Sequence, residues 1–185
     1  MSPWILNRLS RAVSQGAVFG YPTDTIWGFG CHPLIAPSVN RIQQIKRRPA
    51  GKGLILLSSR IEYCAAYIDA DAKALRSIGE PVENPTTWLV PVSNFCPEWL
   101  CGHFPTVAIR ITRHPLIQHI CDQLQAPVVS TSANRSGQST VRNALQMRRQ
   151  FANELDFIVA GFSPGTGRAS EIKSLMTGEI LRSSH

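Results

Sequence analysis

Two kinds of apolar pattern alternate along the chain, and each predicts one type of secondary structure. In the first, apolar residues recur near helical spacing, in segments that often begin with a proline and end at a glycine or a proline. In the second, apolar residues follow one another without interruption, as in a strand that is buried on both faces. We expect helices over 3–15, 37–48, within 61–78 (one or two), 114–124 and 141–151, and strands over 17–21, 53–57, 87–92, 107–111, 127–130, 156–160 and 179–182.

This alternation of helices and strands is typical of an α/β layered fold with a mixed sheet. The chain has 185 residues and neither an internal repeat nor a low-complexity tract, so we expect one domain over 1–185. The Gly/Pro-rich segment 161–169 is too short to be a domain linker. Hydrophobic residues make up 43% of the chain, which excludes intrinsic disorder. No apolar run approaches the roughly 18 residues that span a membrane, and the N-terminus lacks the pattern of a secretory signal.

The cysteines favour a reduced, cytoplasmic protein. Five of them stand at 31, 64, 96, 101 and 121, without a C-x-x-C pair. Cys96 and Cys101 have no second Cys or His pair at zinc spacing. We therefore interpret them as free thiols, mostly buried, and expect no metal site made by the protein.

The charge pattern predicts an anionic partner. The 19 Lys and Arg residues exceed the 12 Asp and Glu residues, which gives a net charge of +7. Two segments, 25–61 and 123–153, contain bases but no acid. Arginine, which outnumbers lysine, suits phosphate and carboxylate groups, so the partner could be a nucleotide, a nucleic acid or both. Solvation of ordinary helix faces is the alternative explanation.

Three polar segments next to predicted strands could carry chemistry. Residues 21–30 contain hydroxyls and glycines after a strand, and residues 130–137 hold hydroxyls, an amide and an arginine after another. Ligands of open α/β sheets bind at the carboxyl ends of strands. Residues 46–53 hold four bases, which could neutralise a triphosphate. An ordinary polar turn and cations at a helix C-terminus remain the alternatives for the first and the last segment.

Several common site motifs are absent from the sequence. There is no Walker A loop, no Rossmann G-x-G-x-x-G and no G-x-S-x-G nucleophile elbow. RRM, KH and OB signatures are missing as well. A serine hydrolase or a dedicated RNA-recognition module is therefore disfavoured.

Taken together, the polar segments resemble those of the YrdC/Sua5 family, in particular its short, single-domain bacterial members. The matching stretches are YPTDTIWGFGC (21–31), IKRRPAGKGLILL (45–57), TVAIRITRHPL (106–116), VVSTSANRSG (128–137) and SEIKSLMTGEILR (170–182). The resemblance implies a YrdC/RibB-like fold of the α+β type, a twisted mixed open sheet flanked by helices.

The resemblance also implies an activity. Family members join L-threonine, bicarbonate and ATP into threonylcarbamoyl-adenylate and release pyrophosphate. A separate threonylcarbamoyl transferase complex then modifies adenosine 37 of tRNAs that read ANN codons, giving t6A. Mg²⁺ normally bridges such phosphates, and we expect it to be held mostly by ATP and water.

Site residues follow from the matched motifs. The resemblance assigns ATP contacts to six residues: Arg48, Lys52, Arg110, Ser132, Asn134 and Arg182. It assigns threonine contacts to four residues: Thr25, Ala108, Ser130 and Ser170. We further hypothesise that Lys46 and Arg48 act electrostatically by stabilising the departing pyrophosphate.

The chain departs from the family pattern at several places. Residues 82–85 are VENP where relatives usually have W-P-G-P, and the loop at 161–169 looks short. His32, Lys173 and Ser174 also replace common family residues. None of these departures removes a phosphate-binding residue.

An RNA-binding factor in ribosomal RNA maturation is the competing interpretation, with weak RNA binding as a secondary property of the enzyme. Arg142, Arg148 and Arg149 lie outside every motif and are either part of a solvated helix face or candidate RNA contacts.

Overall fold

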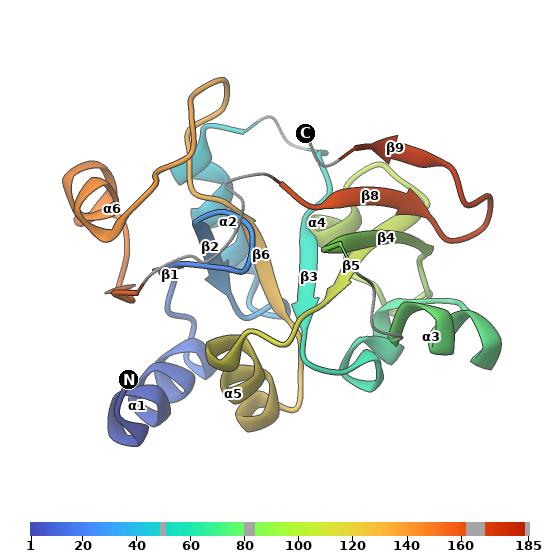
Figure 1. The fold of residues 1–185 in the computed structure, drawn as a ribbon, viewed down its shortest axis with the longest axis horizontal. Helices are drawn as coiled ribbons and strands as arrows, with labels where there is room; N and C mark the ends of the chain where they lie inside the picture. Colours follow the sequence, from blue (N-terminus) through green and yellow to red (C-terminus); the bar gives the residue numbers. More distant parts are fainter. Residues whose placement is uncertain (49–50, 80–83, 162–168, 184–185) are drawn as a thin grey trace.

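The computed structural model describes residues 1–48, 51–79, 84–161 and 169–183. Within these ranges nine strands form one sheet with the order β7-β1-β2-β6-β3-β5-β4-β8-β9 (Figure 1). The strands are β1 (Phe19–Tyr21), β2 (Gly28–Cys31), β3 (Ile55–Ser58), β4 (Thr86–Pro91), β5 (Thr106–Ile111), β6 (Val128–Ser132), β7 (Phe157–Ile158), β8 (Glu171–Ser174) and β9 (Ile180–Arg182). The helices are α1 (Pro3–Ser14), α2 (Ala36–Lys46), the 3₁₀ helix η1 (Ile61–Tyr67), α3 (Ala72–Gly79), α4 (Glu98–Cys101), α5 (Pro115–Leu124) and α6 (Ala144–Phe151).

The sheet is mixed and open. Three neighbouring pairs are parallel, namely β1 with β7, β3 with β5 and β4 with β8. The other pairs are antiparallel. The prediction of a mixed open sheet flanked by helices is confirmed.

The two faces of the sheet are covered unequally. Because side chains alternate along a strand, Leu56 and Val129 enter the core under α2, η1, α4 and α6. Leu57 and Val128 face the opposite way, toward α1 and α5. These two helices pack against each other below the strands in Figure 1. The rest of that second face, from β6 to β9, carries the cavity described below.

Most predicted elements are present, with shifted ends. The predicted helix 37–48 ends at Lys46, because Arg47 adopts the left-handed conformation (φ 49°); the expected stop at residue 49 lies outside the described residues. The predicted helix 141–151 begins only after Asn143, whose side chain accepts a hydrogen bond from the Gln146 amide. The sequence predicted one or two helices within 61–78, and the structure has two, η1 and α3.

Three elements were not predicted: β2, α4 and β8. β2 has the sequence GFGC and was interpreted as part of a polar turn, although all four residues are buried. No helix among the described residues is long and apolar enough to cross a membrane.

Candidate functional site

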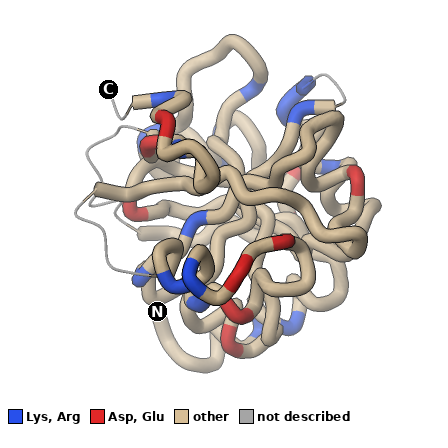
Figure 2. Tube along the Cα trace, turned by 90° about the vertical axis from the view of Figure 1, so that its right-hand side faces the viewer, with Lys and Arg blue, Asp and Glu red and all other residues tan. Residues whose placement is uncertain are grey.

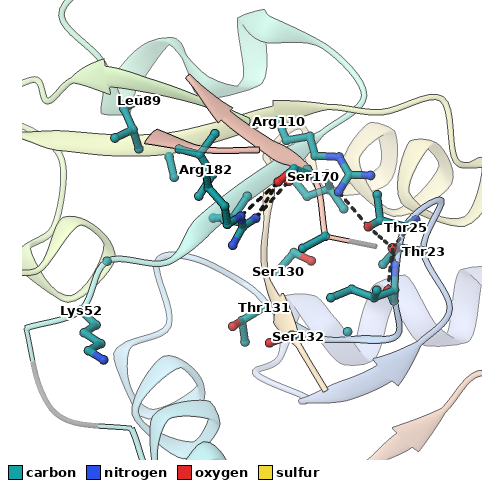
Figure 3. A pocket seen from close by; sticks show the side chains of 18 of the residues that line it. Thr23, Thr25, Lys52, Leu89, Arg110, Ser130, Thr131, Ser132, Ser170 and Arg182 are labelled. Carbon is teal, nitrogen blue, oxygen red and sulfur yellow. Dashed lines mark hydrogen bonds between the residues drawn. The ribbon is translucent and has the colours of Figure 1, made fainter. Parts of the chain in front are cut away.

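A cavity of about 570 Å³ lies on the second face of the sheet (Figure 3). Its floor is a row of paired residues, in which Ile55 of β3 stands between Ser130 of β6 and Ala108 of β5, and Ala108 is paired with Leu89 of β4. All four residues line the cavity because they point to the same side of their strands. The floor is therefore mostly apolar, and its polar groups stand around it.

One end of the cavity is cationic through the segment between α2 and β3. The Arg48 guanidinium donates to the Gly53 carbonyl at 2.9 Å, and desolvation lowers the pKa of Arg48. Lys52 is exposed and forms an isolated antiparallel β-bridge with Gly102, which follows α4. Both cations line the cavity, so an anion that enters at this end meets two positive charges.

Lys46 lies behind the cavity wall rather than in it. Its ammonium donates to the carbonyl of Ser132, to the carbonyl of Asn134 at 3.1 Å and to the Asn134 side-chain oxygen at 3.2 Å. Burial, with a smaller contribution from the charge of Arg48, lowers the pKa of Lys46 to about 8. Lys46 therefore fixes the polar loop that follows β6.

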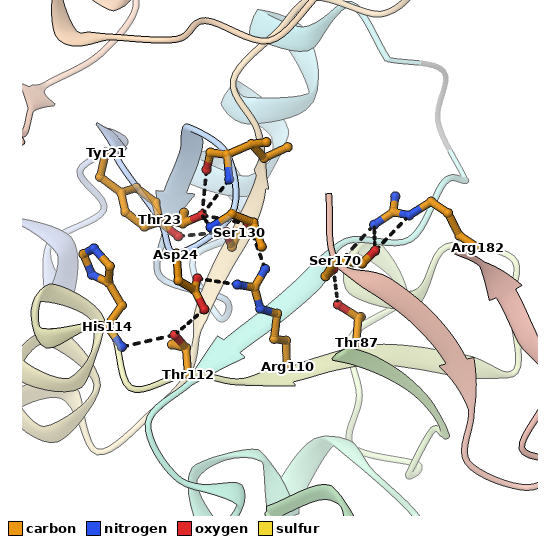
Figure 4. A network of polar contacts seen from close by, with 12 residues as sticks. Tyr21, Thr23, Asp24, Thr87, Arg110, Thr112, His114, Ser130, Ser170 and Arg182 are labelled. Atoms are coloured by element: carbon orange, nitrogen blue, oxygen red, sulfur yellow. Dashed lines mark hydrogen bonds and ion pairs between the residues drawn. The ribbon is translucent and has the colours of Figure 1, made fainter. Parts of the chain in front are cut away.

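The turn after β1 is tied to β5 by a partly buried ion pair (Figure 4). Arg110, whose side chain is only 7% exposed, pairs with the carboxylate of Asp24 and donates to Thr25 Oγ1 at 3.0 Å. Thr112 Oγ1 donates to the other Asp24 oxygen at 3.2 Å. Thr23 Oγ1 and Thr25 Oγ1 are 2.9 Å apart. This network holds the arginine and both threonine hydroxyls at the cavity edge.

Two more hydroxyls in the cavity wall have buried partners. The Ser130 and Tyr21 hydroxyls are 2.7 Å apart, and burial raises the pKa of Tyr21 far above its usual value. The Ser170 and Thr87 hydroxyls are also 2.7 Å apart. Arg182 donates through Nη2 to the Ser170 carbonyl at 2.8 Å. Each of the two serine hydroxyls is thus oriented by a hydroxyl that is itself buried.

The structure brings most of the predicted site residues together. Nine of the eleven line the cavity: Thr25, Arg48, Lys52, Ala108, Arg110, Ser130, Ser132, Ser170 and Arg182. Lys46 and Asn134 are not among its lining residues and contact each other behind Ser132. The roles that sequence resemblance assigned to these residues stay predictions.

Sequence reasoning missed the residues that support the wall. Asp24, Tyr21 and Thr87 were not singled out, although Tyr21 and Asp24 lie within the first polar segment. An acid inside a motif otherwise rich in hydroxyls was the available signal for an ion pair. The family departures at 82–83 and 162–168 lie outside the described residues.

A sheet face that gathers cations and hydroxyls around an apolar floor defines an α/β protein whose cavity suits a polyanionic ligand, as in nucleotide-binding domains. The family model described as "Telomere recombination", that of the Sua5/YciO/YrdC family, matches residues 11–184. The chain belongs to this family.

Relatives and solved structures agree with this placement. A protein of Cellvibrio japonicus named threonylcarbamoyl-AMP synthase is 37% identical over 189 residues, covering 100% of both chains. One of Pseudomonas entomophila with the same name is 36% identical over 98% of both. The structure of P. abyssi Sua5 with L-threonine is similar in fold, with a TM-score of 0.90, 24% identity and coverage of 100% of this chain and 55% of that one. E. coli YciO has a TM-score of 0.86 at 21% identity, with coverage of 99% and 90%.

Proposed function

We propose that the protein is a threonylcarbamoyl-AMP synthase, a nucleotidyltransferase that makes threonylcarbamoyl-adenylate and pyrophosphate from L-threonine, bicarbonate and ATP. The observation that carries the proposal is that nine residues expected from the family motifs line one cavity. The full-length relatives at 36–37% identity that bear this name support it.

The chemistry suits the residue types. Adenylation of a carbamate brings an anion against a triphosphate, so it needs positive charge and hydrogen-bond donors more than a protein nucleophile. Arg48 and Lys52 would take the phosphates at one end, and Arg48 would stabilise the departing pyrophosphate. The hydroxyls of Thr25, Ser130 and Ser170 would hold threonine at the other end.

The structure suggests a different contribution for Lys46 than contact with pyrophosphate. Its ammonium is enclosed by oxygen atoms of the 132–134 loop. We propose that it positions Ser132 for the nucleotide, and that Asn134 acts in the same way.

Mg²⁺ would enter with ATP. The cavity lining contains no Asp or Glu within the described ranges, and Asp24 nearby is engaged by Arg110. The residues present therefore do not form a carboxylate cage, and the phosphates and water would supply the ligands.

The product would pass to a threonylcarbamoyl transferase complex that acts on tRNA. We expect the protein and this complex in the cytoplasm.

RNA binding is the weaker alternative. Arg142, Arg148 and Arg149 are exposed and outside the cavity. On the opposite side of the molecule, where α3, β8 and β9 lie, Figure 2 shows bases with acids among them rather than one continuous basic stripe.

Pyrophosphate release tests the proposal. The protein is incubated with ATP, bicarbonate and threonine, and each substrate is omitted in turn. We expect release that depends on threonine and is lost in Arg48→Ala, with Arg149→Ala as the matched control of an exposed arginine outside the cavity. Near-normal turnover in Arg48→Ala would overturn the role given to the phosphate end.

A further inference from the structure

The loop after α4 runs beside the residues that lead into β3. Residues 51–54 and 100–103 are antiparallel, and backbone contacts join them in register. These contacts are the Leu54 amide with the Leu100 carbonyl at 2.8 Å, the β-bridge of Lys52 with Gly102, and the His103 amide with the Gly51 carbonyl at 3.3 Å. The backbone conformation of the turn that carries Lys52 is therefore supported from outside, by the loop after α4.

Two glycines make this turn depend on such support. Gly51 and Gly53 flank Lys52, and glycine loses more conformational freedom on folding than any other residue. Gly51 has a positive φ of 85°, a backbone conformation that residues with a side chain rarely adopt. Neither neighbour of Lys52 therefore has a side chain that could pack and hold the turn in place.

The ring of His103 occupies the place that a side chain at Gly51 would take. A Cβ built on Gly51 would lie 2.3 Å from Cδ2 and 2.4 Å from Nε2 of His103, so the edge of the imidazole is in contact with the Gly51 Cα. On its other side, His103 is exposed toward a second hollow that Lys52 and Trp99 also line. The ring thus covers Gly51 from the solvent side.

The contact reaches both cations of the substrate cavity through the backbone. Lys52 follows Gly51 directly, and Arg48 donates to the carbonyl of Gly53 at 2.9 Å. His103 itself is not among the described residues that line this cavity, so it would act on a bound anion through the turn. A shift of Gly51 would move Lys52 together with the carbonyl that holds Arg48.

We propose that His103 is a positioning residue for the phosphates of ATP. By packing on the Gly51 Cα, its ring keeps the turn in the conformation that presents Lys52 and Arg48 to the triphosphate. This inference rests on the proposed function for the identity of the anion. It assigns the effect to the shape of the ring and not to its charge or its hydrogen bonds.

Two substitutions of His103 separate packing from charge. His103→Ala removes the ring, so we expect the Kd for ATP in calorimetry and the KM for ATP to rise about tenfold, as when one charge-assisted contact is weakened. The KM for threonine should stay within about threefold. His103→Phe keeps a flat ring without charge, so we expect both ATP values within about threefold of wild type. Because the His103 side chain is exposed, neither variant should change the midpoint of urea unfolding.

A matched control and three outcomes make the test decisive. Phe95→Ala removes a ring that is 83% exposed in the segment before α4, and it is expected to bind ATP as wild type does. An unchanged Kd for ATP in His103→Ala would overturn the inference. So would a His103→Phe variant as weak as His103→Ala, because charge or hydrogen bonding would then be the cause. If the wild type binds ATP but releases no pyrophosphate with threonine, the proposed function is refuted, and the Kd values for ATP still decide the role of His103.

Discussion

The substitution Asp24→Asn tests whether the ion pair of Asp24 with Arg110 at the cavity edge stabilises the fold. The substitution keeps the shape of the side chain and removes its charge, which leaves Arg110 without a carboxylate partner. The Arg110 side chain is 7% exposed and that of Asp24 33%, so solvent screens the pair only in part. Breaking a fully buried pair costs about 3–5 kcal/mol. With Asn still able to accept one hydrogen bond, and with partial exposure, we expect about 2–3 kcal/mol.

Urea unfolding followed by the fluorescence of the four tryptophans measures this loss. A loss of this size would lower the Tm by about 5–10 °C in a chain of this length. Glu171→Gln is the matched control, because its pair with Lys173 has a distance of 3.5 Å and should contribute less than about 1 kcal/mol. If Asp24→Asn is no less stable than Glu171→Gln, the ion pair does not support the cavity edge.

Three further predictions concern other supports of the site. Tyr21→Phe removes the buried 2.7 Å hydrogen bond between the Tyr21 and Ser130 hydroxyls, so we expect the free energy of unfolding in urea to fall by about 1 kcal/mol and the KM for threonine to rise. Unchanged values of both quantities would contradict this prediction. Burial lowers the pKa of Lys46 to about 8, against 10.5 for a free lysine, so the unfolded state binds more protons than the folded state between these pH values. The free energy of unfolding should therefore rise from pH 8 to pH 10.5 in a series of urea titrations, and Lys46→Met should lack that rise. A Cβ on Gly102 would lie 2.2 Å from the carbonyl oxygen of Gly51, in the segment between α2 and β3 that holds Arg48 and Lys52, so Gly102→Ala should weaken ATP binding measured by calorimetry. Gly178→Ala, whose Cβ would have nothing within 4 Å, should leave ATP binding unchanged.

Local patterns predicted the elements whose apolar residues are regularly spaced. The helix at Pro3–Ser14 and the strand at Ile55–Ser58 are examples, since periodicity and a neighbouring breaker residue define both. β2 could not be found in this way, because two of its four residues are glycines. Its burial arises from pairing with β1 and β6, which is a long-range property that a local window does not contain.

For the site, too, local sequence patterns predicted some features and the assembled sheet determined the others. Motifs that follow strands predicted which residues lie at the cavity, because the ends of paired strands meet at one place. The direction of a side chain was beyond such reasoning. Lys46 has the same residue type as Lys52, yet it turns into the 132–134 loop while Lys52 lines the cavity. The partnership of Asp24 and Arg110 joins residues 86 positions apart and likewise depends on the assembled sheet.

Identification of the product tests the proposed activity most directly. The protein is incubated with ATP, threonine and ¹³C-labelled bicarbonate, and the quenched mixture is analysed by mass spectrometry. We predict an adenylate that contains one threonine and one labelled carbon, formed in step with pyrophosphate and absent when any one substrate is omitted. Pyrophosphate without that adenylate, or an adenylate without the label, would contradict a threonylcarbamoyl-AMP synthase.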